Sequence, residues 1–273
     1  MQKNIKLLAL DFDGTVLNSR KEFPEETLEA IIELRRRGVY VVAASGRGIA
    51  EMRDYEKELS HFSHGILVSG GLVYDFQQKK PLSQQCLELG AALQVIHFGL
   101  EERAMVHILT TYESAVQAED LKDMSQFQMG IYQDMYNRVS TPVEDIAAFA
   151  REHADNIGKV NLYHRSPESR ERTRAKLGGL QLTVDDAETT SLEFSSLGIS
   201  KAYGLKWLAE KLGLSISETA AIGDAPNDLE ILKTAGLSIA MGNADEEIKA
   251  ICNTVTLDND ENGVLAAINK YIL

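Results

Sequence analysis

Two aspartates near the N-terminus, Asp11 and Asp13, are the first residues whose types and spacing could do chemistry. They follow the apolar run 6–10 and stand in the sequence Asp11-Phe12-Asp13-Gly14-Thr15. The leucines and alanine of the run suit a helix as well as a strand. The residues from Asp11 to Thr15 are unsuited to continuing a helix and turn the chain, so they favour a buried strand. Two carboxylates this close repel each other unless a cation or a proton lies between them. A solvated acidic turn is the plainer interpretation, and matching groups later in the chain argue against it.

Polar or small residues also follow three later runs that we predict to be strands. The strands and their ends are residues 39–44 before Ser45-Gly46-Arg47, residues 65–68 before Ser69-Gly70-Gly71, and residues 220–222 before Gly223-Asp224-Ala225-Pro226-Asn227-Asp228. Lys201 stands at the start of a predicted helix. Since ligands of open parallel sheets bind beyond the carboxyl ends of the strands, we expect these groups to converge on one rim.

The residue types on this rim favour magnesium and a phosphoryl group. Mg²⁺ prefers a few carboxylates together with water and substrate phosphate oxygens. Four acids are hard to keep ionised together, and a metal ion with Lys201 would supply the compensating charge. A hydroxyl, a lysine and amide N–H groups at strand-to-helix turns suit a phosphate. A carboxylate close to that phosphate can attack phosphorus and form an aspartyl-phosphate.

The order of the predicted elements indicates an α/β fold. Strands and helices alternate up to residue 82, as in a doubly wound parallel-sheet (Rossmann-like) core, and the same alternation returns near residue 190. Between them the pattern predicts helices at 87–111, 143–153 and 166–177 and strands at 159–163 and 180–184, which form an inserted α+β cap domain. We therefore predict a core in two parts, 1–82 and 190–273, and a cap at 83–189.

The charge balance restricts the partners. The 273 residues include 28 Lys and Arg against 41 Asp and Glu, a net charge of −13. Such a surface repels nucleic acid and anionic membranes. No apolar run approaches the roughly 20 residues that span a bilayer, and the N-terminus has no signal-peptide layout. Two cysteines are too few for a disulfide framework, so we expect reduced thiols in a cytoplasmic protein. The oligomeric state is not indicated.

Four motifs in order make the chain resemble the haloacid dehalogenase-like phosphatases. They are Asp11-Phe12-Asp13-Gly14-Thr15, then Ser45, then Lys201, then Gly223-Asp224-x-x-Asn227-Asp228. The chain is most similar to the Cof-type branch, which carries a large α/β cap between the second and third motifs. Further support comes from Ala44-Ser45-Gly46-Arg47, Met241-Gly242-Asn243-Ala244 and Asn262-Gly263-Val264.

The resemblance implies a role for each matching residue. Asp11 would be the nucleophile, and Asp13 the general acid for the leaving alcohol and then the base for the hydrolytic water. The phosphate would be held by Ser45, Gly46, Arg47 and Lys201. Mg²⁺ would be bound by Asp11, Asp13 through its backbone carbonyl, and Asp224, with Asn227 and Asp228 in support. The substrate would be a small phosphomonoester, a sugar phosphate or related metabolite.

Two rival functions stay open at this stage. A sugar phosphomutase or phosphotransferase on the same scaffold would need basic cap residues aimed at a second phosphate, and the candidates are Arg151, Lys159, Arg165, Arg170, Arg172 and Arg174. A non-enzymatic metabolite sensor would be expected to lose a carboxylate, and none is lost. The chain departs from many relatives at Ser69-Gly70-Gly71, where they have Asn-Gly-Ala, and this leaves the orientation of that turn open.

Overall fold

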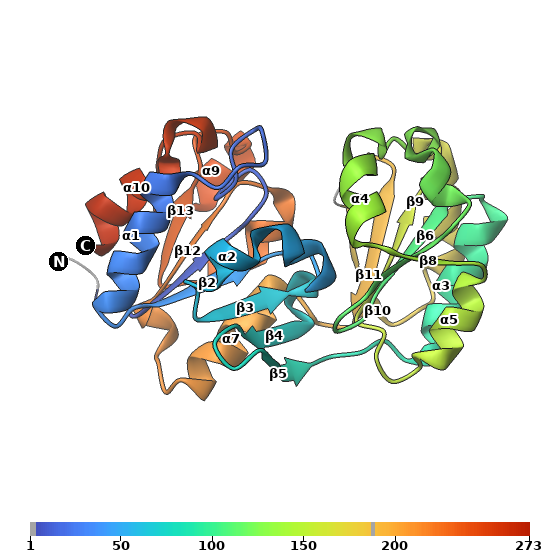
Figure 1. The fold of residues 1–273 in the computed structure, drawn as a ribbon, viewed down its shortest axis with the longest axis horizontal. Coiled ribbons are helices and arrows are strands. Elements are labelled where there is room, and N and C mark those ends of the chain that lie inside the picture. The colour runs from blue at the N-terminus through green and yellow to red at the C-terminus, as the bar shows by residue number, and fades with distance from the viewer. Residues whose placement is uncertain (1–3, 187–188) are drawn as a thin grey trace. The chain divides into compact units, whose positions relative to one another are not determined.

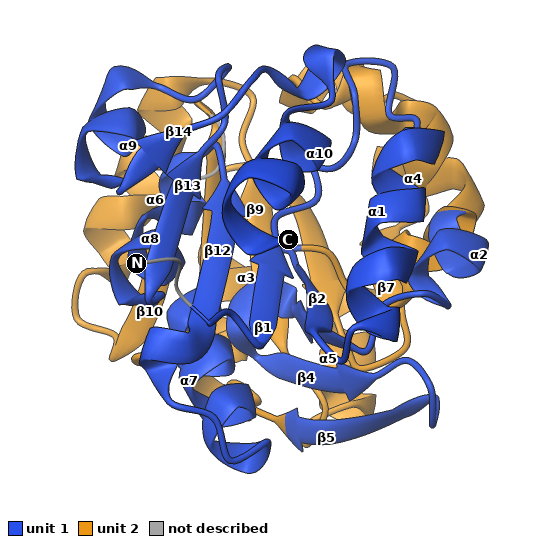
Figure 2. Cartoon of the chain, turned by 90° about the vertical axis from the view of Figure 1, so that its left-hand side faces the viewer, with its two compact units in different colours: residues 1–46, 55–83, 200–273 blue, residues 47–54, 84–199 orange. Residues whose placement is uncertain are grey.

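The chain forms two compact units in the computed structural model, which describes residues 4–186 and 189–273 (Figures 1 and 2). Unit 1 comprises Met1–Gly46, Tyr55–Ser83 and Ser200–Leu273, and unit 2 comprises Arg47–Asp54 and Gln84–Ile199. These groupings differ from the predicted domains in three places, the first being that Ser83 groups with unit 1 and not with the cap. Residues 47–54 group with unit 2, and unit 2 extends to Ile199, beyond the predicted end of the cap at 189.

Unit 1 is built on an eight-stranded sheet in the order β14-β13-β12-β1-β2-β3-β4-β5. The strands are β1 (Leu7–Leu10), β2 (Tyr40–Ala44), β3 (His64–Leu67), β4 (Leu72–Asp75), β5 (Lys80–Gln84), β12 (Thr219–Gly223), β13 (Leu237–Ala240) and β14 (Thr254–Val255). All pairings from β14 to β3 are parallel, and β4 is antiparallel to β3. The central strand β1 thus lies between β2 and β12, so the first and fourth motifs emerge side by side.

Helices cover both faces of this sheet, as the doubly wound prediction requires. They are α1 (Glu25–Arg36), α2 (Glu56–Leu59), α7 (Lys201–Lys211), α8 (Leu229–Thr234), α9 (Glu246–Ile251) and α10 (Gly263–Ala267). Leu7 and Ala9 of β1 share a buried cluster with α7, α8 and α9. Since side chains alternate along a strand, Leu8 and Leu10 face the other side, where α1 packs on β2.

Unit 2 has its own six-stranded sheet, in the order β10-β11-β9-β6-β7-β8, with antiparallel pairing except between β7 and β8. The strands are β6 (Met105–Leu109), β7 (Ser114–Gln117), β8 (Thr141–Val143), β9 (Lys159–Tyr163), β10 (Leu182–Asp185) and β11 (Ser191–Ser196). Its helices are α3 (Leu89–Glu101), α4 (Gln133–Val139), α5 (Ile146–Glu152) and α6 (Pro167–Leu177). Helices α3, α5 and α6 pack on the sheet around one apolar core.

The helix predicted at 87–111 is wrong in its second half. Helix α3 ends at Glu101, Arg103 turns the chain with φ 53°, and Met105–Leu109 form β6. Every residue of β6 is buried, so the strand lacks the polar–apolar alternation that would have distinguished it from a continuing helix. After β2, a 3-10 turn at Ala50–Tyr55 leads into the short helix α2.

No helix among the residues described is both long and apolar enough to cross a membrane.

The turn that departs from the family pattern, Ser69-Gly70-Gly71, is tightly built. Val68 and Ser69 both have φ 53°, and Gly70 has φ 100°. The Ser69 N–H donates to the carbonyl of Ser45 at 3.1 Å, which ties this turn to the end of β2. A Cβ on Gly70 would lie 1.9 Å from the carbonyl oxygen of Ser200, directly before Lys201. Only glycine fits there.

Replacing Gly70 by alanine should therefore destabilise unit 1 by about 2–4 kcal/mol, from backbone strain and overpacking together. Gly179→Ala is the matched control, because its Cβ would meet nothing within 4 Å; it should change the free energy of unfolding by less than about 0.5 kcal/mol. Urea unfolding of the two variants measures both values, and equal stabilities would contradict the packing argument.

Candidate active site

Asp11 lies at the carboxyl end of β1, where the sheet topology places it next to the end of β12. Leu10 pairs with Ile222, and the Asp11 N–H donates to the carbonyl of Ile222 at 3.0 Å. Asp224 is the residue directly after β12. The apolar residues of both strands are buried and fix this register, so the two carboxylates meet although they are far apart in the sequence.

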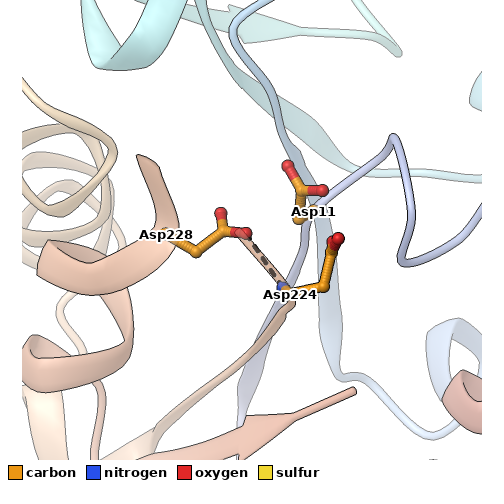
Figure 3. Close-up of side chains that lie close together, drawn as sticks. All are labelled: Asp11, Asp224 and Asp228. Carbon is orange, nitrogen blue, oxygen red and sulfur yellow. Dashed lines mark hydrogen bonds between the residues drawn. The ribbon is translucent and has the colours of Figure 1, made fainter. Parts of the chain in front are cut away.

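Three carboxylates form one cluster, shown in Figure 3: Asp11, Asp224 and Asp228 each offer an oxygen within 4.8 Å of the others. Burial and the charge of Asp228 raise the pKa of Asp11 well above its usual value, against the pull of Lys201. Burial likewise raises the pKa of Asp224 to about 6, although the hydrogen bond from Thr15 opposes this. Burial and mutual repulsion therefore disfavour the charged forms of these carboxylates unless a cation or a proton lies between them.

Lys201 supplies the compensating charge within the protein. It is the first residue of α7. Ser200 caps the N-terminus of this helix, because its side chain accepts a hydrogen bond from the N–H of Tyr203. The buried Nζ of Lys201 lies 2.6 Å from Asp11 Oδ1 and 2.7 Å from Asp228 Oδ1. Burial pushes the pKa of Lys201 down, but Asp11 and Asp228 outweigh it and raise the pKa, so the ammonium stays charged.

Asp228 and Asn227 support the site from the turn that follows β12. Asp228 is fully buried, and its Oδ2 accepts from the N–H groups of Asp224 at 3.1 Å and Ala225 at 3.2 Å. Its other oxygen accepts from Lys201. Asn227 Oδ1 lies 3.4 Å from Lys201 Nζ. Because both oxygens of Asp228 are occupied, this residue shapes the loop and orients the lysine.

The turn after Asp11 folds back onto Asp224. Thr15 Oγ1 donates to Asp224 Oδ1 at 2.7 Å. Gly14 has φ 78°, and a Cβ on it would lie 2.4 Å from Asp224 Oδ2. The Asp13 carboxylate lies outside the cluster of three and pairs with Lys21 Nζ at 2.9 Å. The structure thus holds Asp11 and Asp224 together and leaves the side chain of Asp13 partly exposed.

The predicted phosphate-binding residues of the second motif follow β2. Ser45 is buried, and its N–H donates to the carbonyl of Ile66 at 2.8 Å. Gly46 ends the first stretch of unit 1, and Arg47 begins the segment that groups with unit 2. Within unit 2, Arg47 Nη1 lies 3.3 Å from the carbonyl of Glu51 and 3.3 Å from Met135 Sδ.

Two residues of the site were not predicted from the sequence. Asn243 Nδ2 donates to the carbonyl of Gly14 at 2.8 Å and lies 3.4 Å from Asp224 Oδ2. Its place in the turn after β13 was a usable signal, since that strand neighbours β12. Lys21, the partner of Asp13, sits on a turn with φ 61° and offered no signal beyond its charge.

The donor set fits a magnesium ion. Hard carboxylate oxygens, in numbers that one lysine does not neutralise, are what Mg²⁺ prefers. Asp11, Asp224 and Asp228 are the carboxylates that could hold the ion, and Asp228 also accepts hydrogen bonds from Lys201 and from the N–H groups of Asp224 and Ala225.

Comparisons with known proteins point to one family. A family model described as haloacid dehalogenase-like hydrolase matches residues 8–268. The 5-amino-6-(5-phospho-D-ribitylamino)uracil phosphatase of Bacillus subtilis is 28% identical, covering 99% of this chain and 97% of the relative. The pyridoxal phosphate phosphatase of Escherichia coli is 25% identical, covering 98% and 99%. A crystal structure of a haloacid dehalogenase-like hydrolase from Bacteroides thetaiotaomicron matches with a TM-score of 0.85 and 26% identity, covering 97% of this chain and 99% of that one.

Mg²⁺ binding should depend on pH in a defined direction. The pKa of Asp224 is about 6 without metal, so below that value a proton competes with the metal for the carboxylate. We expect an affinity that falls as the pH drops through about 6, by roughly tenfold per pH unit from Asp224 alone and more steeply where Asp11, whose pKa is also raised, takes up a proton too. Isothermal titration calorimetry with MgCl₂ from pH 5 to 8 measures this. Asp224→Asn is the control, with weak binding throughout; an unmodified chain that binds equally well at pH 5 and 8 would contradict the prediction.

Removing the buried ammonium of Lys201 should lower the free energy of unfolding of the metal-free protein. Lys201→Met leaves Asp11 and Asp228 facing each other without their cation, and we expect a loss of about 3–5 kcal/mol in the free energy of unfolding at pH 7.5. The loss should shrink at pH 5, where Asp11 takes up a proton more readily. Chemical unfolding at both pH values checks this, with Lys206→Met, an exposed lysine of the same helix, as the control.

Proposed function

The chain belongs to the haloacid dehalogenase-like hydrolases, and from that premise we propose that it is a magnesium-dependent phosphatase of a small phosphomonoester. The observation that carries the proposal is the ammonium of Lys201, bonded at once to Asp11 and Asp228 beside Asp224. Family membership bears out the resemblance noted in the sequence. The phosphatase names of the relatives support the reaction class.

In this proposal Asp11 is the nucleophile. Its carboxylate must be ionised to attack phosphorus, and Lys201 at 2.6 Å favours the ionised form against burial and Asp228. Attack forms an aspartyl-phosphate while the ester bond to the leaving oxygen breaks. Asp13 is the proposed general acid that protonates this oxygen, and then the base that takes a proton from the hydrolytic water. Water attack on phosphorus releases phosphate and restores the Asp11 carboxylate.

The remaining residues hold the phosphate and the metal. We propose that Ser45, Gly46, Arg47 and Lys201 bind the phosphate oxygens, whose charge shifts in the transition state. The proposed metal ligands are Asp11, Asp224 and the backbone carbonyl of Asp13, while Asn227 and Asp228 fix the loop and the lysine. When bound, Mg²⁺ would neutralise the carboxylates and polarise the phosphate.

The substrate is proposed only as a class. The two relatives are named for different metabolites, a ribitylaminouracil phosphate and pyridoxal phosphate, so neither name transfers to this chain. A sugar phosphate or related small metabolite in the cytoplasm remains our proposal. The net charge of −13 argues against a phosphodiester polymer as substrate.

The basic residues of unit 2 give little support to a phosphomutase. Lys159 pairs with Glu193, Arg170 with Glu171, Arg172 with Glu102, and Arg174 with Asp186. Arg165 lies over the ring of Phe127. Groups held this way are poorly placed to form a cationic site for a second phosphate, so hydrolysis remains the function that the geometry favours.

Asp11→Asn should abolish turnover and leave the fold intact. The amide has the same shape but cannot attack phosphorus, so we expect a fall in kcat of at least about a thousandfold. Phosphate release from a panel of phosphorylated metabolites, with Mg²⁺ and with a chelator, measures the reaction. Asp155→Asn, an exposed aspartate, is the matched control. A folded Asp11→Asn protein that still turns over substrate would remove Asp11 as the nucleophile.

A further inference from the structure

A short segment, residues 47–54, groups with unit 2 although unit 1 flanks it on both sides in the sequence. It begins at Arg47, two residues after Ser45, and contains a carboxylate that the sequence analysis did not single out. Glu51 is only 5% exposed, in the 3-10 turn that starts at Ala50. A carboxylate this deeply buried in a loop requires a physical reason.

Glu51 closes the loop through its side chain and its backbone. Its Oε2 accepts a hydrogen bond from the N–H of Gly48 at 2.8 Å, and its own N–H donates to the carbonyl of Gly48 at 3.1 Å. Its carbonyl accepts from Arg47 Nη1 at 3.3 Å. One residue therefore fixes both the backbone after Arg47 and the direction of the Arg47 guanidinium.

The sheet of unit 2 provides the surface behind Glu51. His107 Nε2 on β6 lies 3.8 Å from Glu51 Oε1 and 2.8 Å from Ser114 Oγ. Asn161 Nδ2 lies 3.2 Å and Tyr136 Oη 3.3 Å from His107 Nδ1, so both ring nitrogens of His107 have partners within unit 2. Burial lowers the pKa of His107 to about 3, so the ring is neutral. Glu51 therefore lies beside a neutral ring at 3.8 Å, beyond hydrogen-bond distance, while His107 Nε2 pairs with Ser114.

The loop that contains Glu51 also lies close to β6. A Cβ on Gly48 would lie 3.2 Å from Leu109 Cδ2, so the backbone of Gly48 sits directly on the strand. The same Nη1 of Arg47 also lies 3.3 Å from Met135 Sδ of α4. Burial raises the pKa of Glu51, and the Gly48 N–H and the charge of Arg47 oppose this. The residues that Glu51 contacts in the loop, Gly48 and Arg47, are therefore among those that favour its charged form.

We propose that Glu51 is a positioning residue that presets the loop after Ser45, and the Arg47 guanidinium in particular, for binding the phosphate group of the substrate. This inference rests on the proposed function for what the loop binds. Glu51 contacts no reacting atom and acts through Arg47 and the Gly48 backbone. Because a preset phosphate contact is present in ground state and transition state alike, its loss should weaken binding and leave the chemical step nearly unchanged.

The test compares four single variants on the best substrate of the panel. Glu51→Ala should raise KM about tenfold, the effect of one lost buried hydrogen bond, with kcat within about twofold. Glu51→Asp keeps the charge but shortens the reach to the Gly48 N–H, so it should raise KM similarly even if Glu51→Ala fails to fold. Glu51→Gln can still accept that hydrogen bond and should stay within about twofold of the unmodified chain.

Glu102→Ala is the matched control, because Glu102 is a carboxylate of unit 2 with 11% side-chain exposure that pairs with Arg172. It should leave KM unchanged.

A double-mutant cycle separates positioning from general stability. If Glu51 acts through Arg47, then Glu51→Asp should raise KM little further in an Arg47→Ala background. Independent, multiplying effects would overturn the proposal, and so would a Glu51→Asp variant with unchanged KM or with a loss confined to kcat.

Failure of the proposed function would be seen separately. If the unmodified chain hydrolyses no phosphomonoester, calorimetric titration with inorganic phosphate in the presence of Mg²⁺ still compares it with Glu51→Asp. Weaker phosphate binding by the variant supports the positioning role. Equal affinities, or no binding by either protein, overturn it.

Discussion

The site depends on one buried ammonium held between two buried carboxylates. Lys201 bonds to Asp11 and Asp228 at 2.6 and 2.7 Å, and without it the three carboxylates would share a small volume without the ammonium that neutralises part of their charge. Three neighbouring residues support this arrangement. Ser200 caps the helix that presents the lysine, Gly70 allows a turn to pack against that cap, and Asp228 links the lysine to the loop that carries Asp224.

The topology explains why residues from opposite ends of the chain meet here. Strand β1 lies between β2 and β12, all three are parallel, and each ends at the same edge of the sheet. The buried apolar residues of β1 and β12 fix the register, because a slip by one residue would turn buried side chains to the wrong face. Core packing therefore sets the distance between Asp11 and Asp224 before any ligand is present.

The core and its rim were predictable from the sequence because each strand ended in an abrupt change from apolar to polar residues. The helix α1 follows the prediction closely, with Glu25 and Glu26 in its first turn and Arg35 and Arg36 in its last. Strand β6 was missed because it is buried throughout and shows no alternation. Asn243, Lys21 and Glu51 were missed for another reason: each acts through a particular hydrogen bond, and the sequence alone does not show which groups come into contact.

The carboxylate cluster is the place where local consistency gives way to function. Burying Asp11, Asp224 and Asp228 together raises the pKa of Asp11 and of Asp224, so at neutral pH the metal-free fold holds charge that burial disfavours. A protein selected for stability alone would replace one of these acids. Here all are kept, and one lysine offsets only part of their charge. Such a site is destabilising by itself, and a cation that bound only the folded state would stabilise it. The electrostatic strain is thus itself an argument that the rim binds a metal ion.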